Sequence, residues 1–169
     1  MIELRVLTPD DWRSWRALRL AALADAPYAF KSPLSDWQGP GDREERWRDR
    51  LSVPGACDLL ALLDGDPVGM AGGTPGAAPG EAWLRSLWVG ASGRGRGVAD
   101  RLLYAVEEWA AGAGADVLRL SVIPGNTHAI ALYRRHGFAD TGRPGDLLPD
   151  GRHEVVMAKR LDGTPSRTG

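Results

Sequence analysis

Hydrophobic and polar residues repeat with two different periods along the chain, and this separates candidate strands from candidate helices. Residues 2–6 alternate apolar and polar side chains and predict a half-exposed strand. From Trp12 to Ala22, apolar side chains recur at three- and four-residue steps, which predicts a helix with one buried face. Thr8-Pro9-Asp10-Asp11 supplies a helix start with a capping box, and Pro27 ends the helix.

The middle of the chain consists of short apolar runs separated by turns. Residues 42–51 predict a short charged helix that is anchored by Trp47. Apolar runs at 58–63 and 68–71 flank an Asp-Gly-Asp turn and predict a β-hairpin. Residues 74–80 are glycine, proline and alanine for the most part and predict a flexible connection.

The second half of the chain alternates strands with amphipathic helices. Strands are predicted at 81–89, 117–123, 138–141 and 153–160, and helices at 98–112 and 126–136. This order predicts one α/β or α+β domain in which helices cover a mixed sheet. We expect the domain to span residues 1–161 and residues 162–169 to form a flexible C-terminal tail.

Composition narrows the class of protein only slightly. The chain has 169 residues and a net charge of −1, so we expect neither a nucleic-acid nor a membrane-surface partner. A single cysteine, Cys57, fits a reducing compartment. The N-terminus lacks the basic-then-apolar pattern of a signal peptide. We therefore expect a cytoplasmic monomer or small oligomer, such as a homodimer.

The stretch from Ser86 to Leu103 runs from an apolar strand through a glycine- and arginine-rich loop into a helix. Glycine allows close approach of the backbone to a ligand, and a helix N-terminus presents unpaired N–H groups and a positive dipole end. Arginine fits phosphate oxygens in a forked geometry. The pattern predicts a pyrophosphate site; the alternative is a plain glycine-rich turn whose arginines face solvent.

Two common phosphate loops do not fit this stretch. A P-loop needs Lys-Ser or Lys-Thr after its last glycine, but Val98-Ala99 follows Gly97. A dinucleotide fingerprint needs a glycine five residues after its first, where Gly93 leads to Val98 and Gly95 leads to Asp100. The loop is therefore neither a P-loop nor a dinucleotide-binding loop.

A third pattern matches. Arg94-Gly95-Arg96-Gly97-Val98-Ala99 fits Arg/Gln-x-x-Gly-x-Gly/Ala, the pyrophosphate loop of the GNAT superfamily of N-acetyltransferases. Residues 126–138 resemble the second signature of that superfamily, Asn-x-x-Ala-x-x-Leu-Tyr-x-x-x-Gly-Phe. The order of elements over residues 2–160 is also similar to this fold. The resemblance implies a central mixed sheet of about seven strands flanked by about four helices, and acetyl-CoA as the acyl donor.

The resemblance also implies where the coenzyme lies. A bulge near Leu87-Trp88-Val89 would pair its backbone with the pantetheine arm. The backbone amides of Arg94, Gly95, Arg96, Gly97, Val98 and Ala99 would hold the pyrophosphate. The strand at 117–123 would splay away from 81–89 to leave a slot for the thioester, and Asn126 would contact the coenzyme beyond it.

Tyr133 is the residue that the resemblance marks as the general acid. A tyrosine with an ordinary pKa of about 10 suits donation of a proton to the departing thiolate. The backbone N–H of Val89 or Trp88 could stabilise the oxyanion. The alternative for Tyr133 is a core aromatic on an amphipathic helix, since it continues the stripe of Ala129 and Ile130.

The base is less clearly marked. Relatives carry a glutamate at one of two positions, which in this chain are Trp83 and Ser121. Glu81 precedes Trp83 by two residues on the same strand face and could reach the slot or act through water. Its alternative is a solvated carboxylate at a strand end, and an acceptor amine that is already partly neutral would need no dedicated base.

The sequence therefore predicts an N-acetyltransferase that moves an acetyl group to a primary amine by direct attack in a ternary complex. The amine can be a small molecule, a protein N-terminus or a lysine. Trp83 and residues 28–30 are candidates for an acceptor pocket. The three histidines lack partners at ligand spacing, so we expect no metal. The rival is a non-catalytic acyl-CoA-binding module of the same fold.

Overall fold

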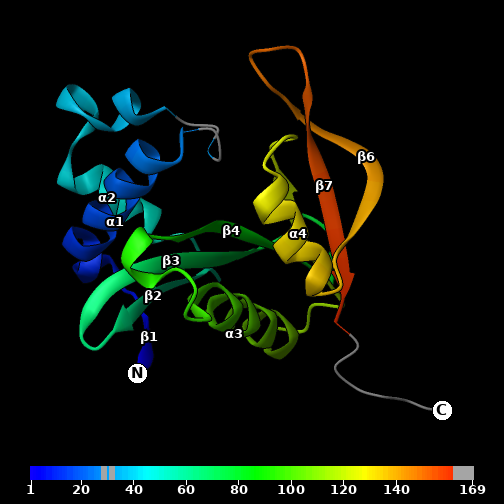
Figure 1. Ribbon diagram of the computed structural model, residues 1–169, viewed down its shortest axis with the longest axis horizontal. Coiled ribbons are helices and arrows are strands. Elements are labelled where there is room, and N and C mark those ends of the chain that lie inside the picture. Colours follow the sequence, from blue (N-terminus) through cyan, green and yellow to red (C-terminus); the bar gives the residue numbers. More distant parts are fainter. Residues whose placement is uncertain (28–29, 31–32, 162–169) are drawn as a thin grey trace.

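The computed structural model describes residues 1–27, residue 30 and residues 33–161, and its centre is a seven-stranded mixed sheet (Figure 1). The strands are β1 (Ile2–Val6), β2 (Cys57–Leu63), β3 (Asp66–Pro75), β4 (Glu81–Val89), β5 (Val117–Val122), β6 (Ala139–Leu147) and β7 (His153–Arg160). The α-helices are α1 (Trp12–Asp25), α2 (Glu44–Arg50), α3 (Val98–Gly112) and α4 (Thr127–Arg135). This confirms the predicted fold class. The tail predicted at 162–169 lies outside the described residues.

The strand order across the sheet is β1-β2-β3-β4-β5-β7-β6. Strands β1 to β4 form an antiparallel meander, and β5, β7 and β6 form an antiparallel unit on the other side. The two units meet where β4 pairs with β5 in parallel. As Figure 1 shows, α1 and α2 cover one face of the β1–β4 unit and α3 covers the other.

Each face of the sheet has its own hydrophobic core. On the α3 face, Leu102, Leu103 and Val106 are fully buried against the sheet. On the opposite face, Trp15 of α1 and Trp47 of α2 are buried. The prediction that Trp47 anchors the short charged helix is confirmed. Both layers depend on the amphipathic stripes that the sequence shows.

Two strands extend further than the sequence predicts. Strand β3 continues to Pro75 through residues that read as a connection, and β6 continues to Leu147. In β3 the reason is close packing, because a side chain at Gly72 would lie 2.8 Å from Asp58 Oδ1 and one at Gly73 would clash with the Trp109 ring. Glycine is thus required inside this strand by its neighbours.

The first helix begins as the sequence predicts, with one refinement. Residues Pro9–Asp11 form a 3-10 turn that leads into α1, and the Thr8 backbone N–H donates to Asp11 Oδ2 at 2.7 Å.

Among the described residues, none of the helices has the length and apolar character needed to cross a membrane.

Candidate active site

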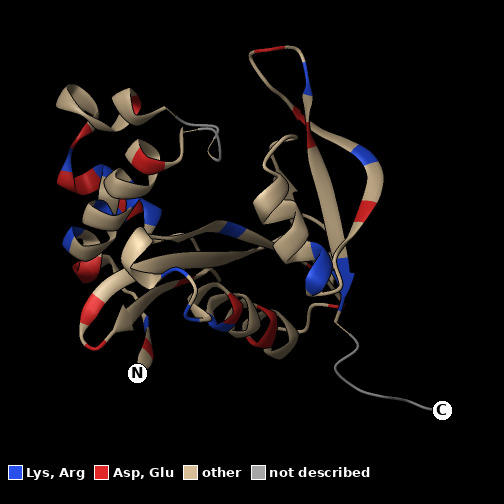
Figure 2. Cartoon of the chain, viewed as in Figure 1, with Lys and Arg blue, Asp and Glu red and all other residues tan. Residues whose placement is uncertain are grey.

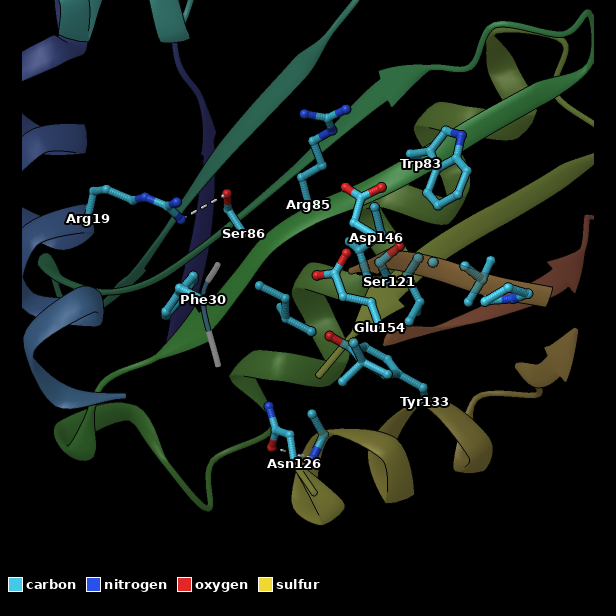
Figure 3. A pocket seen from close by; sticks show the side chains of 18 residues that line it. Arg19, Phe30, Trp83, Arg85, Ser86, Ser121, Asn126, Tyr133, Asp146 and Glu154 are labelled. Carbon is cyan, nitrogen blue, oxygen red and sulfur yellow. Dashed lines mark hydrogen bonds between the residues drawn. The ribbon is translucent and has the colours of Figure 1, made fainter. Parts of the chain in front are cut away.

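A cleft opens between β4 and β5 because the two strands pair over only part of their length. Residues Glu81–Trp83 are in register with Val117–Arg119, and beyond them the strands separate. The separation leaves a cleft of about 600 Å³, walled by Trp83–Leu87 of β4 and Leu120–Val122 of β5 (Figure 3). The predicted splay of these strands is confirmed.

Strand β4 carries a bulge beside this cleft. The register with β3 passes from Met70↔Trp88 to Gly72↔Arg85, so two residues of β4, Ser86 and Leu87, stand opposite one residue of β3. Ser86 has φ of +59°, which a residue with a side chain rarely adopts. The bulge thus begins one residue before the predicted Leu87-Trp88-Val89, and Trp88 and Val89 are back in register. The apolar alternation of the strand gives no sign of this shift.

The glycine-arginine loop leads into the N-terminus of α3, as expected. Gly97 is the N-cap of α3 with φ of +79°, and Gly95 has φ of +74°. A Cβ at either glycine would meet nothing within 4 Å. Glycine is therefore favoured here by the positive φ, and not by a lack of space for a side chain. The N–H groups of the first turn, from Val98 onward, have no carbonyl partner within the helix. Figure 2 shows basic positions in this loop.

Arg94 ties the loop to the end of α1. Its Nη2 donates to Asp25 Oδ2 at 2.6 Å and its Nε donates to the Val89 carbonyl at 3.0 Å. Trp88 Nε1 donates to the same carboxylate at 3.2 Å. These hydrogen bonds, that of Arg94 first, lower the pKa of Asp25. The Arg94 guanidinium is therefore occupied by protein groups, while the exposed Arg96 is the second cation of the loop.

Tyr133 lies on the buried face of α4 and lines the cleft (Figure 3). Its ring meets Phe138 edge-on, with 6.0 Å between the ring centroids. The hydroxyl makes no hydrogen bond to any residue that the structure describes. Burial raises the pKa of Tyr133, so at neutral pH the hydroxyl keeps its proton and can donate it.

Asn126 begins the same helix and also lines the cleft. Its side-chain oxygen accepts the Ala129 backbone N–H at 3.4 Å, as an N-cap does. Phe30 and Trp83, which the sequence offers as candidates for an acceptor pocket, line the cleft as well; their role toward an acceptor stays a prediction. The prediction for residues 28 and 29 lies outside the described residues.

Glu81, the carboxylate that the sequence offers as a base, is held in an ion pair. Arg119 Nε donates to one oxygen at 2.8 Å and Trp83 Nε1 donates to the other at 3.2 Å. Glu81 is not among the described residues that line the cleft. This pair fastens β4 to β5 just where they are in register. A role for Glu81 in catalysis stays a prediction.

Four charged residues of the cleft are not identified from the sequence, and one of them is Arg85 of β4. The carboxylates of Asp146 on β6 and Glu154 on β7 line the cleft, as does the guanidinium of Arg19 on α1 (Figure 3). Both carboxylates lie around a turn-rich segment that carries no local pattern. Arg19 did give a signal, since it is an arginine on the apolar stripe of its helix. Trp83 and Ser121, where relatives carry a glutamate, line the cleft too.

A family model described as "Acetyltransferase (GNAT) family" matches residues 15–138. Because the match covers most of the chain, this protein belongs to the GNAT family of acetyltransferases. It is 33% identical over 100 residues to a protein named IAA acetyltransferase from Azospirillum brasilense. That alignment covers 59% of this chain and 65% of the relative, which is less than two thirds of the relative's length.

Solved structures share the whole fold at low sequence identity. A GNAT-family acetyltransferase from Streptococcus pneumoniae has a TM-score of 0.76 at 22% identity, over 95% of this chain and 99% of its own. YncA of Salmonella typhimurium, solved with its cofactor acetyl-CoA, has a TM-score of 0.75 at 18% identity, over 100% of this chain and 99% of its own. PaiA N-acetyltransferase from Thermoplasma acidophilum, in complex with coenzyme A, has a TM-score of 0.74 at 18% identity, over 95% of this chain and 99% of its own.

Proposed function

We propose that this protein is an acetyl-CoA-dependent N-acetyltransferase that acetylates a primary amine by direct attack in a ternary complex. The observation that carries the proposal is the cleft between β4 and β5, with the N-terminus of α3 at the end of β4 and Tyr133 inside. Membership of the GNAT acetyltransferase family supports the reaction class.

The coenzyme site that we propose follows the backbone from β4 into α3. Beyond Trp83, β4 is not paired with β5, so its edge can bind the peptide-like pantetheine arm as an added strand would. The amides of residues 94–99, with the dipole of α3, suit the pyrophosphate. The structures named with acetyl-CoA and coenzyme A, which share this fold, support the choice of donor.

The chemistry that we propose needs two positions in the cleft. The neutral amine attacks the acetyl carbonyl carbon, and the C–S bond then breaks while the new C–N bond remains. We propose that backbone N–H groups in the bulge or just after it, at Leu87, Trp88 or Val89, stabilise the oxyanion. The Tyr133 hydroxyl gives its proton to the departing sulfur; burial raises its pKa, which keeps the phenol protonated at neutral pH and makes it a weaker acid than a free tyrosine.

The proton that the ammonium loses needs an acceptor. We propose Glu154, because its carboxylate lines the cleft and that of Glu81 does not. Comparison of Glu154→Gln with Glu81→Gln separates the two candidates. Glu154→Gln should lower kcat/KM by about 10²-fold and remove the acidic limb of its pH profile. A larger loss for Glu81→Gln, with the fold intact, would return the role to Glu81.

The test of the proposal is an acetyl-CoA turnover screen across classes of amine, with release of the free thiol and acetylated product both measured. Tyr133→Phe separates an enzyme from an acyl-CoA-binding module. We expect coenzyme A affinity to be nearly unchanged and turnover to fall at least about tenfold. Absence of turnover with every amine, together with normal coenzyme A binding, would favour the module.

The coenzyme site has its own test by calorimetry with coenzyme A. Because Arg94 is occupied by Asp25, we expect Arg96→Ala to weaken binding of the coenzyme and Arg94→Ala to loosen the loop as well. Arg13→Ala on the exposed side of α1 is the matched control. Binding that is absent in the wild type, or unchanged in the Arg94→Ala plus Arg96→Ala protein, contradicts the proposed coenzyme site.

A further inference from the structure

Arg19 is a buried cation that extends from α1 to the cleft. Its residue is only 7% exposed, which places it with the hydrophobic core of that helix. Burial, and then repulsion from Arg50, lower its pKa to about 10, so the guanidinium remains charged at neutral pH. Figure 3 shows the side chain pointing toward Ser86 at the edge of the cleft.

This buried charge has no carboxylate partner among the residues that the structure describes. Nη1 donates to Ser86 Oγ at 3.2 Å, and the guanidinium lies over the Phe30 ring, 4.8 Å from its centroid. Its Nε is buried and has no hydrogen-bond partner within residues 1–27, 30 and 33–161. A buried arginine is normally paired, because an uncompensated charge is costly to desolvate. The cleft therefore holds an unsatisfied requirement for an anion.

The charges around Arg19 add to this requirement. Arg50 and Arg85 are also close by, and Asp58 is the carboxylate whose charge Arg50 experiences. Burial raises the pKa of Asp58 to about 6, so this carboxylate is only weakly held in its charged form. Arg50 thus interacts with three other guanidiniums, those of Arg19, Arg46 and Arg85, and with one carboxylate, that of Asp58. Arg85, like Arg19, is a cleft-lining residue.

The opposite wall of the cleft has the reverse charge. Asp146 and Glu154 belong to β6 and β7, and Figure 3 shows them across the cleft from Arg19. A ligand that carries both an anionic group and an ammonium group fits this division, with the anion at Arg19 and the amine toward the carboxylates. A plain alkylamine would leave the Arg19 guanidinium buried and unpaired.

We infer that the acceptor is a small amine that carries a carboxylate close to the reacting nitrogen, as an amino acid does. This rests on the proposed function, because it names the acceptor of that same cleft. Ser86, which accepts from Arg19, is the bulge residue, so the carboxylate site adjoins the backbone where the acetyl group would lie. A protein N-terminus or a lysine side chain within a chain lacks the adjacent carboxylate.

The inference predicts discrimination between matched acceptors. Each amino acid of a panel is compared with its carboxamide and with the amine that lacks the carboxyl group, at saturating acetyl-CoA. We expect kcat/KM for the acid to exceed that for the other two by about 10- to 100-fold, mostly in KM. Arg19→Gln should remove the preference and Arg19→Lys should restore part of it, since lysine keeps the charge and loses the fork.

Controls keep the outcome readable. Arg13→Gln changes an exposed arginine of the same helix and should keep the preference of the wild type. Product binding gives a second readout that needs no turnover, in which N-acetyl amino acids, but not their amides, raise the melting temperature of the coenzyme A complex. Equal use of acids and amides, or a preference that survives Arg19→Gln, overturns the inference and leaves the proposed function standing. Failure to acetylate any amine contradicts the proposed function itself.

Discussion

The buried charge of Arg19 should lower the free energy of unfolding, and Arg19→Met tests this directly. Methionine retains an unbranched apolar stem of similar length and removes the guanidinium. If Arg19 serves a ligand and not the fold, the variant should be more stable than the wild type. Most substitutions at buried positions lower stability, so a gain is an unusual outcome that a purely structural arginine would not give.

The size of the effect follows from the contacts of Arg19. Its pKa falls from 12.5 to about 10 through burial, which corresponds to about 3 kcal/mol against the charged form. The variant loses the hydrogen bond to Ser86 and the contact with Phe30, which together lower its stability by about 1 to 2 kcal/mol. The net expectation is a gain of about 1 to 2 kcal/mol, or a rise in Tm of about 2 to 8 °C.

The sign of the pH dependence gives a further check. The folded-state pKa of Arg19 is below its unfolded value. The loss of stability caused by its buried charge is therefore complete at pH below about 10 and declines as pH rises from about 10 toward 12.5. Urea titrations at pH 7.5 and pH 10.5 measure it. The advantage of Arg19→Met over the wild type should be largest at pH 7.5 and smaller at pH 10.5.

A fall in stability for Arg19→Met would refute this reasoning, because it would mean that the guanidinium holds the fold together. Arg13→Met on the same helix is the control and should change stability by less than about 0.5 kcal/mol. Coenzyme A should stabilise both proteins, but an N-acetyl amino acid added to the coenzyme A complex should raise the stability of the wild type further and not that of the variant, which separates a ligand-binding charge from one that is merely misplaced.

Three other substitutions test the fold around the cleft, each by urea unfolding. Leu102→Ala removes a fully buried side chain of α3 and should cost about 2 to 5 kcal/mol; a loss below about 1 kcal/mol would contradict its place in the core. Gly73→Ala drives a methyl group into the Trp109 ring and should cost about 1 to 3 kcal/mol, whereas Gly112→Ala, with nothing within 4 Å, should cost nothing. Because burial raises the pKa of Asp58 to about 6, its contribution to stability is full below about pH 4 and is lost as pH rises through 6. Asp58→Asn should therefore gain about 1 kcal/mol at pH 7.5 and little at pH 4, and equal effects at both values would show that Asp58 titrates normally.

The elements that the sequence predicts correctly are those whose local pattern agrees with their packing. Strands 2–6, 81–89 and 153–160 have the boundaries that alternation indicates. The helix that follows the glycine-arginine loop begins at Val98, where the sequence places it. In each case the buried face is visible as a period in the chain itself.

The failures come from contacts between distant parts of the chain. The predicted strand at 68–71 stops short of Gly72 and Gly73, yet β3 continues through both, and Asp58 and Trp109 occupy the space that side chains there would need. Glu81 reads as a free carboxylate, yet it pairs with Arg119, which lies 38 positions further on. Asp146 and Glu154 reach the cleft through the β6–β7 pairing, which no short motif encodes.

The bulge residue and the buried arginine are departures from local rules, and both lie at the cleft. Among the described residues other than glycine, Ser86 and Asp64 have positive φ, and Asp64 is explained by its hairpin turn. Ser86 lies in the β4 bulge and accepts a hydrogen bond from Arg19, for which the described part of the chain offers no carboxylate partner. A positive φ and a buried arginine without a described carboxylate partner lie side by side, which supports the inference that this part of the cleft serves binding. Ser86→Gly should therefore relieve the backbone strain while it releases Arg19, so that stability is kept and the preference for carboxylated amines is lost.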